Sequence, residues 1–357
     1  MRWVFRLSLE LLSKDKKALP YFAALCFFFS LVDVLLPKPI PFFRLGLANI
    51  SLMLSLDVLS PSAFFLLLSL KVLGQAMLSG TVFSYILLLS FAGTFSSGVV
   101  MYLLNFARRK NLLSFLGVSM LGAIASNASQ FFIARFAIFG EGAYLILPPL
   151  FLISLFSSFA IGLFANSFYS SSLWYEGFLT GELKLKEYDA NLYNLPQKSE
   201  SMYRWIVGLL MLFFLVFLQL PQVKIVIFVI AFFLCIVERV KMHFLSTLLT
   251  TLAIIVVNLF PPHGFVIFQT TLFDIFPIVI TKEALLQGAE KALLFEGLLH
   301  TSKWMLKSPL SLGGNFGNLL QRSLFVFQRL MTCKNEIRIS NLVGSIDSVL
   351  LSLNRLV

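Results

Sequence analysis

Residues 19–36 read LPYFAALCFFFSLVDVLL, an apolar run in which Asp33 is the sole charged residue. A helix of about 20 mainly apolar residues crosses the hydrocarbon core of a bilayer, and a somewhat shorter one suffices when protein surrounds it. The run follows a basic N-terminal stretch, and Pro37-Lys38-Pro39 comes after it in place of a small-x-small cleavage site. It predicts a retained first transmembrane span rather than a cleaved signal peptide.

The composition of the whole chain agrees with this start. Hydrophobic residues make up 58% of the 357 residues and charged residues only 13%, whereas a soluble domain has roughly 25% charged residues. The bilayer must therefore solvate much of the surface. A net charge of +11 is typical of a membrane protein with basic cytoplasmic loops, and we do not expect nucleic acid as a partner.

Further apolar segments predict ten spans in two groups. The first group covers residues 19–36, 45–58, 61–78, 82–105, 112–138 and 143–168, and the second covers residues 203–219, 222–237, 245–260 and 264–280. The second span is short and carries Asn49 and Ser51, which favours packing inside the bundle over contact with lipid. Basic residues gather in alternate loops, as the positive-inside rule requires for a cytoplasmic N-terminus. We expect an all-α, multi-pass protein of the cytoplasmic (inner) membrane.

A polar stretch divides the chain into domains. We expect a six-helix membrane domain over residues 1–168, a cytoplasmic linker over 169–203, and a second helical membrane domain with an amphipathic cytoplasmic tail over 204–357. From residue 280 to 307, charges alternate with leucines at helical spacing, which predicts an amphipathic or partner-facing helix. The sequence leaves open whether the helices between 283 and 331 cross the membrane.

Polar residues at membrane depth mark the candidate site, because an unpaired polar group is costly there. The predicted substrate-binding residues are Arg44, Gly46, Asn49, Gln75, Asn127 and Gln130. Asp274, a lone carboxylate in the tenth apolar segment, is the candidate for proton or cation coupling. Glycines and amides within membranes also serve close helix packing and hydrogen bonds between helices. For the four amides, ligand binding and helix packing are about equally favoured.

Catalysis and metal binding are disfavoured. The chain has no aspartate-rich pair of motifs that would hold Mg-diphosphate, and no Walker A sequence. Its three cysteines and three histidines lack the spacing of metal ligands. We expect no enzymatic activity of this chain alone, no cofactor and no metal.

Three motifs carry a resemblance to a known family: PIPFFRLGLANI at 39–50, KVLGQ at 71–75 and GVSMLGAIASNASQ at 117–130. Over residues 19–168 the chain resembles the Gx transporter family, earlier named heptaprenyl diphosphate synthase component I. Lys71 stands where an arginine is common, and Ser126 where a histidine often precedes the asparagine. The resemblance implies a fold similar to the substrate-binding (S) components of energy-coupling-factor transporters, with six helices around a ligand cavity.

The second half is similar to the transmembrane (T) component of those transporters, mainly through ITKEALLQG at 280–288. This likeness implies an ATPase or other membrane subunits as partners, beside the lipid bilayer. The expected function is binding and transport of a small, partly apolar metabolite. Two alternatives stay open: an accessory membrane subunit for isoprenoid or quinone (heptaprenyl diphosphate) synthesis, and a non-transporting component of a membrane redox complex.

Overall fold

A computed structural model of the chain describes residues 2–35, 45–139, 143–180, 202–218, 220–240, 244–259, 271–275, 278–307 and 314–355. Within these ranges almost every element is a helix, so the all-α prediction is confirmed apart from one hairpin. Four helical stretches are long and apolar enough to cross a membrane: 61–79, 85–109, 115–136 and 147–171. The chain is a multi-pass membrane protein.

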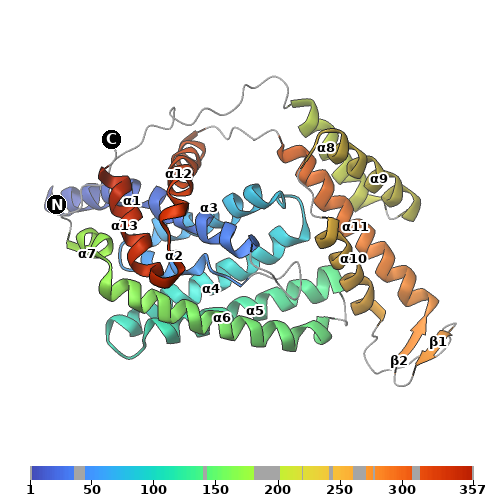
Figure 1. Cartoon of the computed structure of the whole chain (residues 1–357), viewed down its shortest axis with the longest axis horizontal. Helices are drawn as coiled ribbons and strands as arrows, with labels where there is room; N and C mark the ends of the chain where they lie inside the picture. Colours follow the sequence, from blue (N-terminus) through green and yellow to red (C-terminus); the bar gives the residue numbers. More distant parts are fainter. Residues whose placement is uncertain are drawn as a thin grey trace.

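The first bundle contains α1 (Arg2–Leu35), α2 (Asn49–Ser55), α3 (Pro61–Ser79), α4 (Tyr85–Arg109), α5 (Phe115–Ile133) and α6 (Ala143–Ser171). A π-helical turn, Ala134–Phe139, continues α5. Helices α4, α5 and α6 run side by side, and α3 packs against both α1 and α4 (Figure 1). Aromatic side chains from α1 and α3, including Phe22, Phe27 and Phe64, are fully buried in the core between them.

The second predicted span crosses this bundle although only seven of its residues form α-helix. At one end the N–H of Leu45 donates to Asp33 Oδ1 (3.0 Å), and at the other the N–H of Ser60 donates to Asp15 Oδ1 (3.3 Å). Because a helix rises 1.5 Å per residue, these two aspartates lie about 27 Å apart along α1. The segment therefore returns along the membrane-spanning part of α1. Residues 50–55 are buried, which confirms the predicted packing inside the bundle.

The second bundle contains α8 (Met202–Phe217), α9 (Pro221–Val237), α10 (Phe244–Leu259) and α11 (Lys282–Leu306). Helices α8 to α10 correspond to the predicted spans, and α11 to the predicted amphipathic helix. Figure 1 shows α11 lying along the other three, and its buried face includes Phe295, Leu298 and Trp304. The charged residues of α11 are therefore held on a helix that is central to its own bundle.

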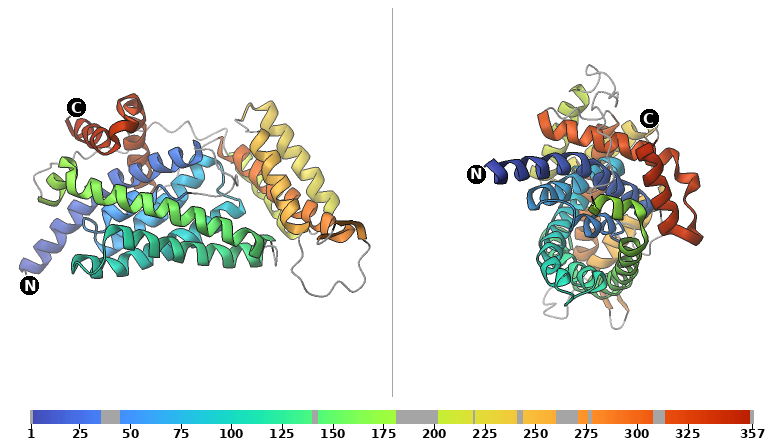
Figure 2. Two further views of the ribbon diagram at one scale, coloured as in Figure 1. Left: turned by 60° about the horizontal axis from the view of Figure 1, so that its bottom comes forward. Right: turned by 90° about the vertical axis from the view of Figure 1, so that its left-hand side faces the viewer.

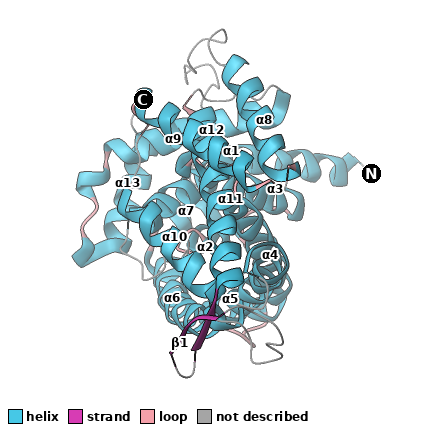
Figure 3. Cartoon of the chain, turned by 90° about the vertical axis from the view of Figure 1, so that its right-hand side faces the viewer, coloured by secondary structure: helices cyan, strands magenta, loops and turns pink. Residues whose placement is uncertain are grey.

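The tenth predicted span is wrong in its described part, which forms a β-hairpin. Strand β1 (Thr271–Ile275) pairs antiparallel with β2 (Ile278–Thr281), drawn in magenta in Figure 3. These strands are rich in β-branched and aromatic residues, which favour strands. A short apolar run does not by itself distinguish a strand from a buried helix. Asp274 therefore lies opposite Val279 in β1 and not in a spanning helix.

The last two helices return to the first bundle instead of extending the second. Helix α12 (Gly314–Thr332) lies along α1, where the Phe27 and Phe327 rings meet edge to face at 6.1 Å. Helix α13 (Leu342–Arg355) packs on α6 and on the short α7 (Leu173–Thr180). In Figure 2 these red helices lie over the blue α1, far from the yellow helices of the second bundle.

Asp347 of α13 caps the start of α7. Its carboxylate accepts hydrogen bonds from the Trp174 N–H (2.9 Å), the Leu173 N–H (3.3 Å) and the Ser172 hydroxyl. A carboxylate at this position satisfies N–H groups that have no partner within the helix. Asp347 thus joins the C-terminal helix to the end of the membrane bundle.

We expect Asp347→Ala to lower the stability of the protein by about 1–3 kcal/mol, because it leaves buried donors without an acceptor. Thermal unfolding of the detergent-solubilised chain measures this loss. Ser348→Ala, which removes a hydroxyl that bonds within α13, is the matched control and should unfold close to wild type. Equal melting temperatures for Asp347→Ala and wild type would contradict the capping role.

Candidate functional site

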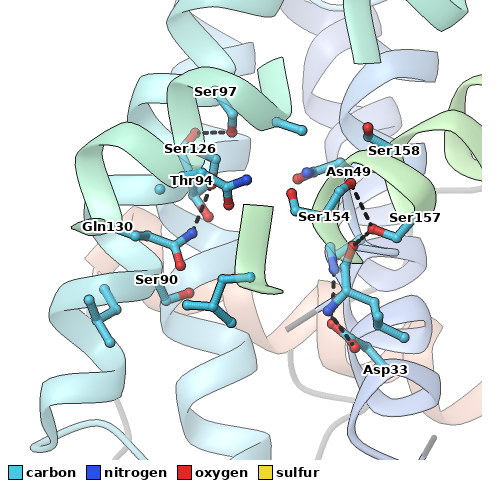
Figure 4. A pocket seen from close by; sticks show the side chains of 18 of the residues that line it. Asp33, Asn49, Ser90, Thr94, Ser97, Ser126, Gln130, Ser154, Ser157 and Ser158 are labelled. Atoms are coloured by element: carbon cyan, nitrogen blue, oxygen red, sulfur yellow. Dashed lines mark hydrogen bonds between the residues drawn. The ribbon is translucent and has the colours of Figure 1, made fainter. Parts of the chain in front are cut away.

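A cavity of about 110 Å³ lies within the first bundle, among α2, α3, α4, α5 and α6. It is several times larger than the space one water molecule needs. Five predicted site residues lie on its wall: Gly46, Asn49, Gln75, Asn127 and Gln130. Figure 4 shows Asn49 and Gln130 on opposite sides of it. Of the other two predicted residues, Arg44 falls outside the described residues and Asp274 belongs to β1.

One side of the cavity is formed by α2, α3 and the end of α1. Lys71 Nζ donates to Asn49 Oδ1 at 2.5 Å, and Gln75 lies one turn further along α3. This bond fixes the orientation of the Asn49 amide, with Nδ2 lying over Gly46. Gly46 has φ +82°, a left-handed backbone conformation that favours glycine. This conformation explains why a glycine stands at this position of the motif. Asp33 accepts the N–H of Gly46 at 3.2 Å and holds this turn.

The opposite side is formed by α4 and α5. Gln130 Nε2 donates to Ser126 Oγ at 2.8 Å, and both side chains lie against Gly93. A Cβ atom at Gly93 would come within 2.2 Å of Gln130 Nε2, so glycine is needed for this contact. Asn127 is only 8% exposed, and its Nδ2 has no hydrogen-bond partner within the described part of the chain. A buried donor without a partner is costly and is rare in native structures.

Three serines of α6 complete the polar lining, and the sequence analysis missed them. Ser157 Oγ donates to Leu45 O (2.7 Å) and so ties α6 to the turn before α2, while Ser158 Oγ donates to a carbonyl of its own helix. With Ser154 they share one helix face, since residues three and four apart are neighbours on a helix. The helical spacing of these serines within an otherwise apolar segment was the sequence signal that could have identified them as candidate site residues. Figure 4 shows all three facing the cavity.

Apolar side chains close another end of the cavity, and the second bundle packs behind them. The residues that both line the cavity and join a hydrophobic cluster with α10 and α11 are Ile86, Leu89, Phe131, Ala134, Ala143 and Leu150. Phe295 and Leu299 of α11 belong to the same cluster. Close by, the N–H of Phe83 donates to Ser302 Oγ of α11 (3.2 Å). The second bundle therefore packs against the outer side of the apolar wall of the cavity.

Comparisons with known proteins assign the two bundles to different family models. Residues 22–168 match a family described as heptaprenyl diphosphate synthase component I, and residues 200–308 match a domain of unknown function, DUF8519. Neither the curated proteins nor the solved structures contain a match. All the cavity residues, from Asp33 to Ile161, fall within the first matched range. The predicted resemblance to the Gx transporter family, formerly named heptaprenyl diphosphate synthase component I, is thus confirmed for residues 22–168.

Proposed function

We propose that this chain binds a small, partly apolar metabolite in the cavity and moves it across the cytoplasmic membrane, without catalysing a reaction. The convergence of Asn49, Gln75, Asn127 and Gln130 on one cavity supports this function most directly. These amides come from three separate membrane segments. A concave, mainly apolar site with a few convergent polar groups is typical of small-molecule binding.

The arrangement of the first bundle supports a role like that of an S component of energy-coupling-factor transporters. Asp57, after α2, binds Arg108 and Arg109 at the end of α4, and Ser60 bonds to Asp15 in the N-terminal half of α1. These contacts gather the basic loop and the N-terminal part of α1 at one end of the bundle. By the positive-inside rule that end is cytoplasmic, and the cavity lies toward the other end.

The second bundle fits a T-like role in the same chain. It packs behind the apolar end of the cavity through α10 and α11, so a movement of α11 would reach the ligand through Phe131 and Leu150. An ATPase or another membrane subunit that acts on this bundle would then be coupled to the cargo. In this account Asp274 has no role in the cavity, and its contribution to coupling stays a prediction.

A second candidate function follows from the description of the matched family. A component of heptaprenyl diphosphate synthase would act beside a soluble enzyme, and this chain lacks the aspartate-rich motifs that hold Mg-diphosphate. The chain would then be an accessory membrane subunit. Stoichiometric co-purification with a synthase that carries such motifs is the result that would favour this function.

Uptake by membrane vesicles tests the transport proposal. Vesicles that carry the full chain are incubated with a metabolite extract, and their contents are compared by mass spectrometry with those of vesicles lacking it. We expect a metabolite to accumulate with wild type and to fall about tenfold with Asn49→Ala, since losing a ligand hydrogen bond and leaving its partner unsatisfied costs about 1–3 kcal/mol.

The matched control is Gln328→Ala, which removes an exposed amide on α12 and should leave uptake unchanged. Failure of any metabolite to accumulate in a chain-dependent manner, with the expected ATPase or membrane partners present, would contradict transport.

A further inference from the structure

Polar contacts attach α11 to both ends of α9. Near the start of α9, Lys224 forms an ion pair with Glu290 of α11. Just after the end of α9, Glu238 accepts the indole N–H of Trp304 of α11 at 3.0 Å and pairs with Arg204 of α8 at 2.8 Å. Because a helix rises 1.5 Å per residue, these two sets of contacts lie about 21 Å apart along α9. The charged groups at both ends of the second bundle are therefore engaged.

Between these ends α11 carries a deeply buried carboxylate, Glu296. It is only 2% exposed, and His300, one turn further along the helix, is fully buried. His300 Nδ1 lies 2.8 Å from the backbone carbonyl oxygen of Glu296 and 3.4 Å from its carboxylate Oε2. Because a carbonyl oxygen only accepts, Nδ1 carries a proton, and Nε2 of the neutral ring is an acceptor. Two proton-accepting groups are thus buried side by side.

These two side chains lack the hydrogen bonds that a buried charge needs. Among the described residues, neither carboxylate oxygen of Glu296 and no acceptor or donor for His300 Nε2 has a hydrogen-bond partner. The Phe228 and Phe232 rings of α9 lie against the imidazole, with centres 5.7 and 5.5 Å from its own. A buried carboxylate without donors is costly as an anion, and binding a proton removes its charge. These surroundings therefore favour a carboxyl group that holds a proton.

The other polar groups near the pair moderate this cost without removing it. Lys303, on the same helix, attracts Glu296 electrostatically, and Thr251 of α10 approaches it without reaching hydrogen-bond geometry. From α9, Cys235 Sγ donates to the backbone carbonyl of His300 at 3.4 Å. Helix α10 contains no charged residue, and the one in α8 is the arginine paired at the end of the bundle. The charge state of Glu296 is therefore left to proton binding.

The pair lies directly behind the apolar wall of the cavity. Phe295, the neighbour of Glu296 in the chain, and Leu299 belong to the hydrophobic cluster that contains Phe131 and Leu150 of that wall. Adding or removing a charge on this part of α11 changes the forces that hold the helix within its bundle. A change in the position of α11 then reaches the cavity through this cluster.

We propose that Glu296, beside His300, is a proton-binding site and that its loading couples proton movement to movement of the cargo. The carboxylate takes a proton from water at one face of the membrane, which forms an O–H bond and removes the charge. The same bond breaks when the proton returns to water at the other face. The coupling rests on the proposed function, whereas proton binding by Glu296 stands apart from it.

Difference infrared spectroscopy of the full chain in detergent tests proton binding. The sample is taken from about pH 9 to about pH 5.5, above the range in which exposed carboxyl groups usually titrate, and the carbonyl stretch of a protonated carboxyl group is recorded. We expect this band in wild type and its loss in Glu296→Gln. Glu290→Gln, a matched change on the same helix, should keep it. A wild type without the band, or a band that Glu296→Gln leaves unaltered, overturns the proposal.

Vesicle uptake under an imposed pH gradient tests the coupling. Vesicles that carry the full chain receive the metabolite extract with a gradient of about one pH unit in each direction, with and without a protonophore. We expect one direction to raise accumulation by up to about tenfold in wild type, because one pH unit is a tenfold ratio of proton activity. Glu296→Gln should lose this dependence, and Glu296→Asp, which keeps an exchangeable proton, should restore at least part of it. Accumulation that ignores the gradient overturns the coupling.

Failure of this inference is distinguishable from failure of the proposed function. Chain-dependent uptake without a carboxyl band that needs Glu296 would refute the proton site and leave transport standing. The band without any chain-dependent uptake would count against transport and against the coupling, and would leave the proton site standing. Size-exclusion chromatography confirms folding of Glu296→Gln, whose amide has the shape and neutrality of the protonated carboxyl group.

Discussion

Gly93→Leu is expected to abolish ligand binding while the protein still folds. Gly93 faces the α5 side of the cavity, and even a Cβ atom there would come within 2.2 Å of Gln130 Nε2 and 2.7 Å of Ser126 Oγ. A leucine must displace Gln130 or extend into the cavity, which has a volume of only about 110 Å³. We expect affinity to fall by about a hundredfold or more, which corresponds to about 2.7 kcal/mol, whereas overpacking costs about 1–3 kcal/mol of stability.

Val99→Leu is the matched control for this substitution. Val99 lies on the same helix but is 40% exposed on the outer surface of the chain, so added bulk there meets lipid and not the cavity. Binding is measured with whichever metabolite the wild-type chain retains, and folding with size-exclusion chromatography and thermal unfolding. A folded Gly93→Leu protein that binds this metabolite as well as wild type would place the binding site elsewhere.

Asp57→Asn is expected to cause the largest loss of stability in the first bundle. Asp57 forms ion pairs with Arg108, where both side chains are 10% exposed, and with Arg109 Nε at 3.0 Å. The Arg108 guanidinium also lies 4.3 Å from the centre of the Phe115 ring, so it is held away from water. Removing one partner of a buried pair leaves the other charge uncompensated, which costs about 3–5 kcal/mol.

Denaturant titration of the purified chain measures this loss. Glu176→Gln, at an exposed carboxylate of α7, is the control and should change stability little. Adding Arg108→Gln to Asp57→Asn should recover at least part of the loss, because no buried uncompensated charge then remains and the exposed Arg109 is solvated by water. A double variant as unstable as the sum of the single variants would show that the pair does not act as a unit.

Much of the first bundle could be predicted from its hydrophobic segments alone. Apolar runs long enough for a bilayer correspond to α1, α3, α4, α5 and α6. The four amides were predictable as candidates because polar groups at membrane depth need partners, and the structure places them on one cavity. Their binding of a ligand remains a prediction.

Other features depend on tertiary contacts that leave little trace in the sequence. The segment around α2 crosses the first bundle with only seven helical residues because Asp33 and Asp15 hold its two ends. The hydrophobic periodicity of the sequence does not predict those hydrogen bonds. The return of α13 to the first bundle depends on Asp347, far along the chain from the helix that it caps. The hairpin of β1 and β2 is apolar like a span, so hydrophobicity alone predicted the wrong structure.

The sequence analysis missed the place of Lys71 and of the α6 serines in the cavity wall for a different reason. Lys71 stood out only as a departure from the family pattern, and its role depends on reaching Asn49 across two segments. Ser157 and Ser158 donate to backbone carbonyls of α6, a local use of hydroxyls that is common in helices. Only the position of α6 relative to α2 makes Ser157 part of the cavity wall.

Native mass spectrometry of the protein purified gently from its own membrane tests the central claim most directly. The account predicts that wild type retains a small molecule, and that Gly93→Leu loses it while Val99→Leu keeps it. An empty wild-type chain bound stoichiometrically to a prenyl diphosphate synthase or to redox subunits would contradict the account and make this chain an accessory membrane subunit.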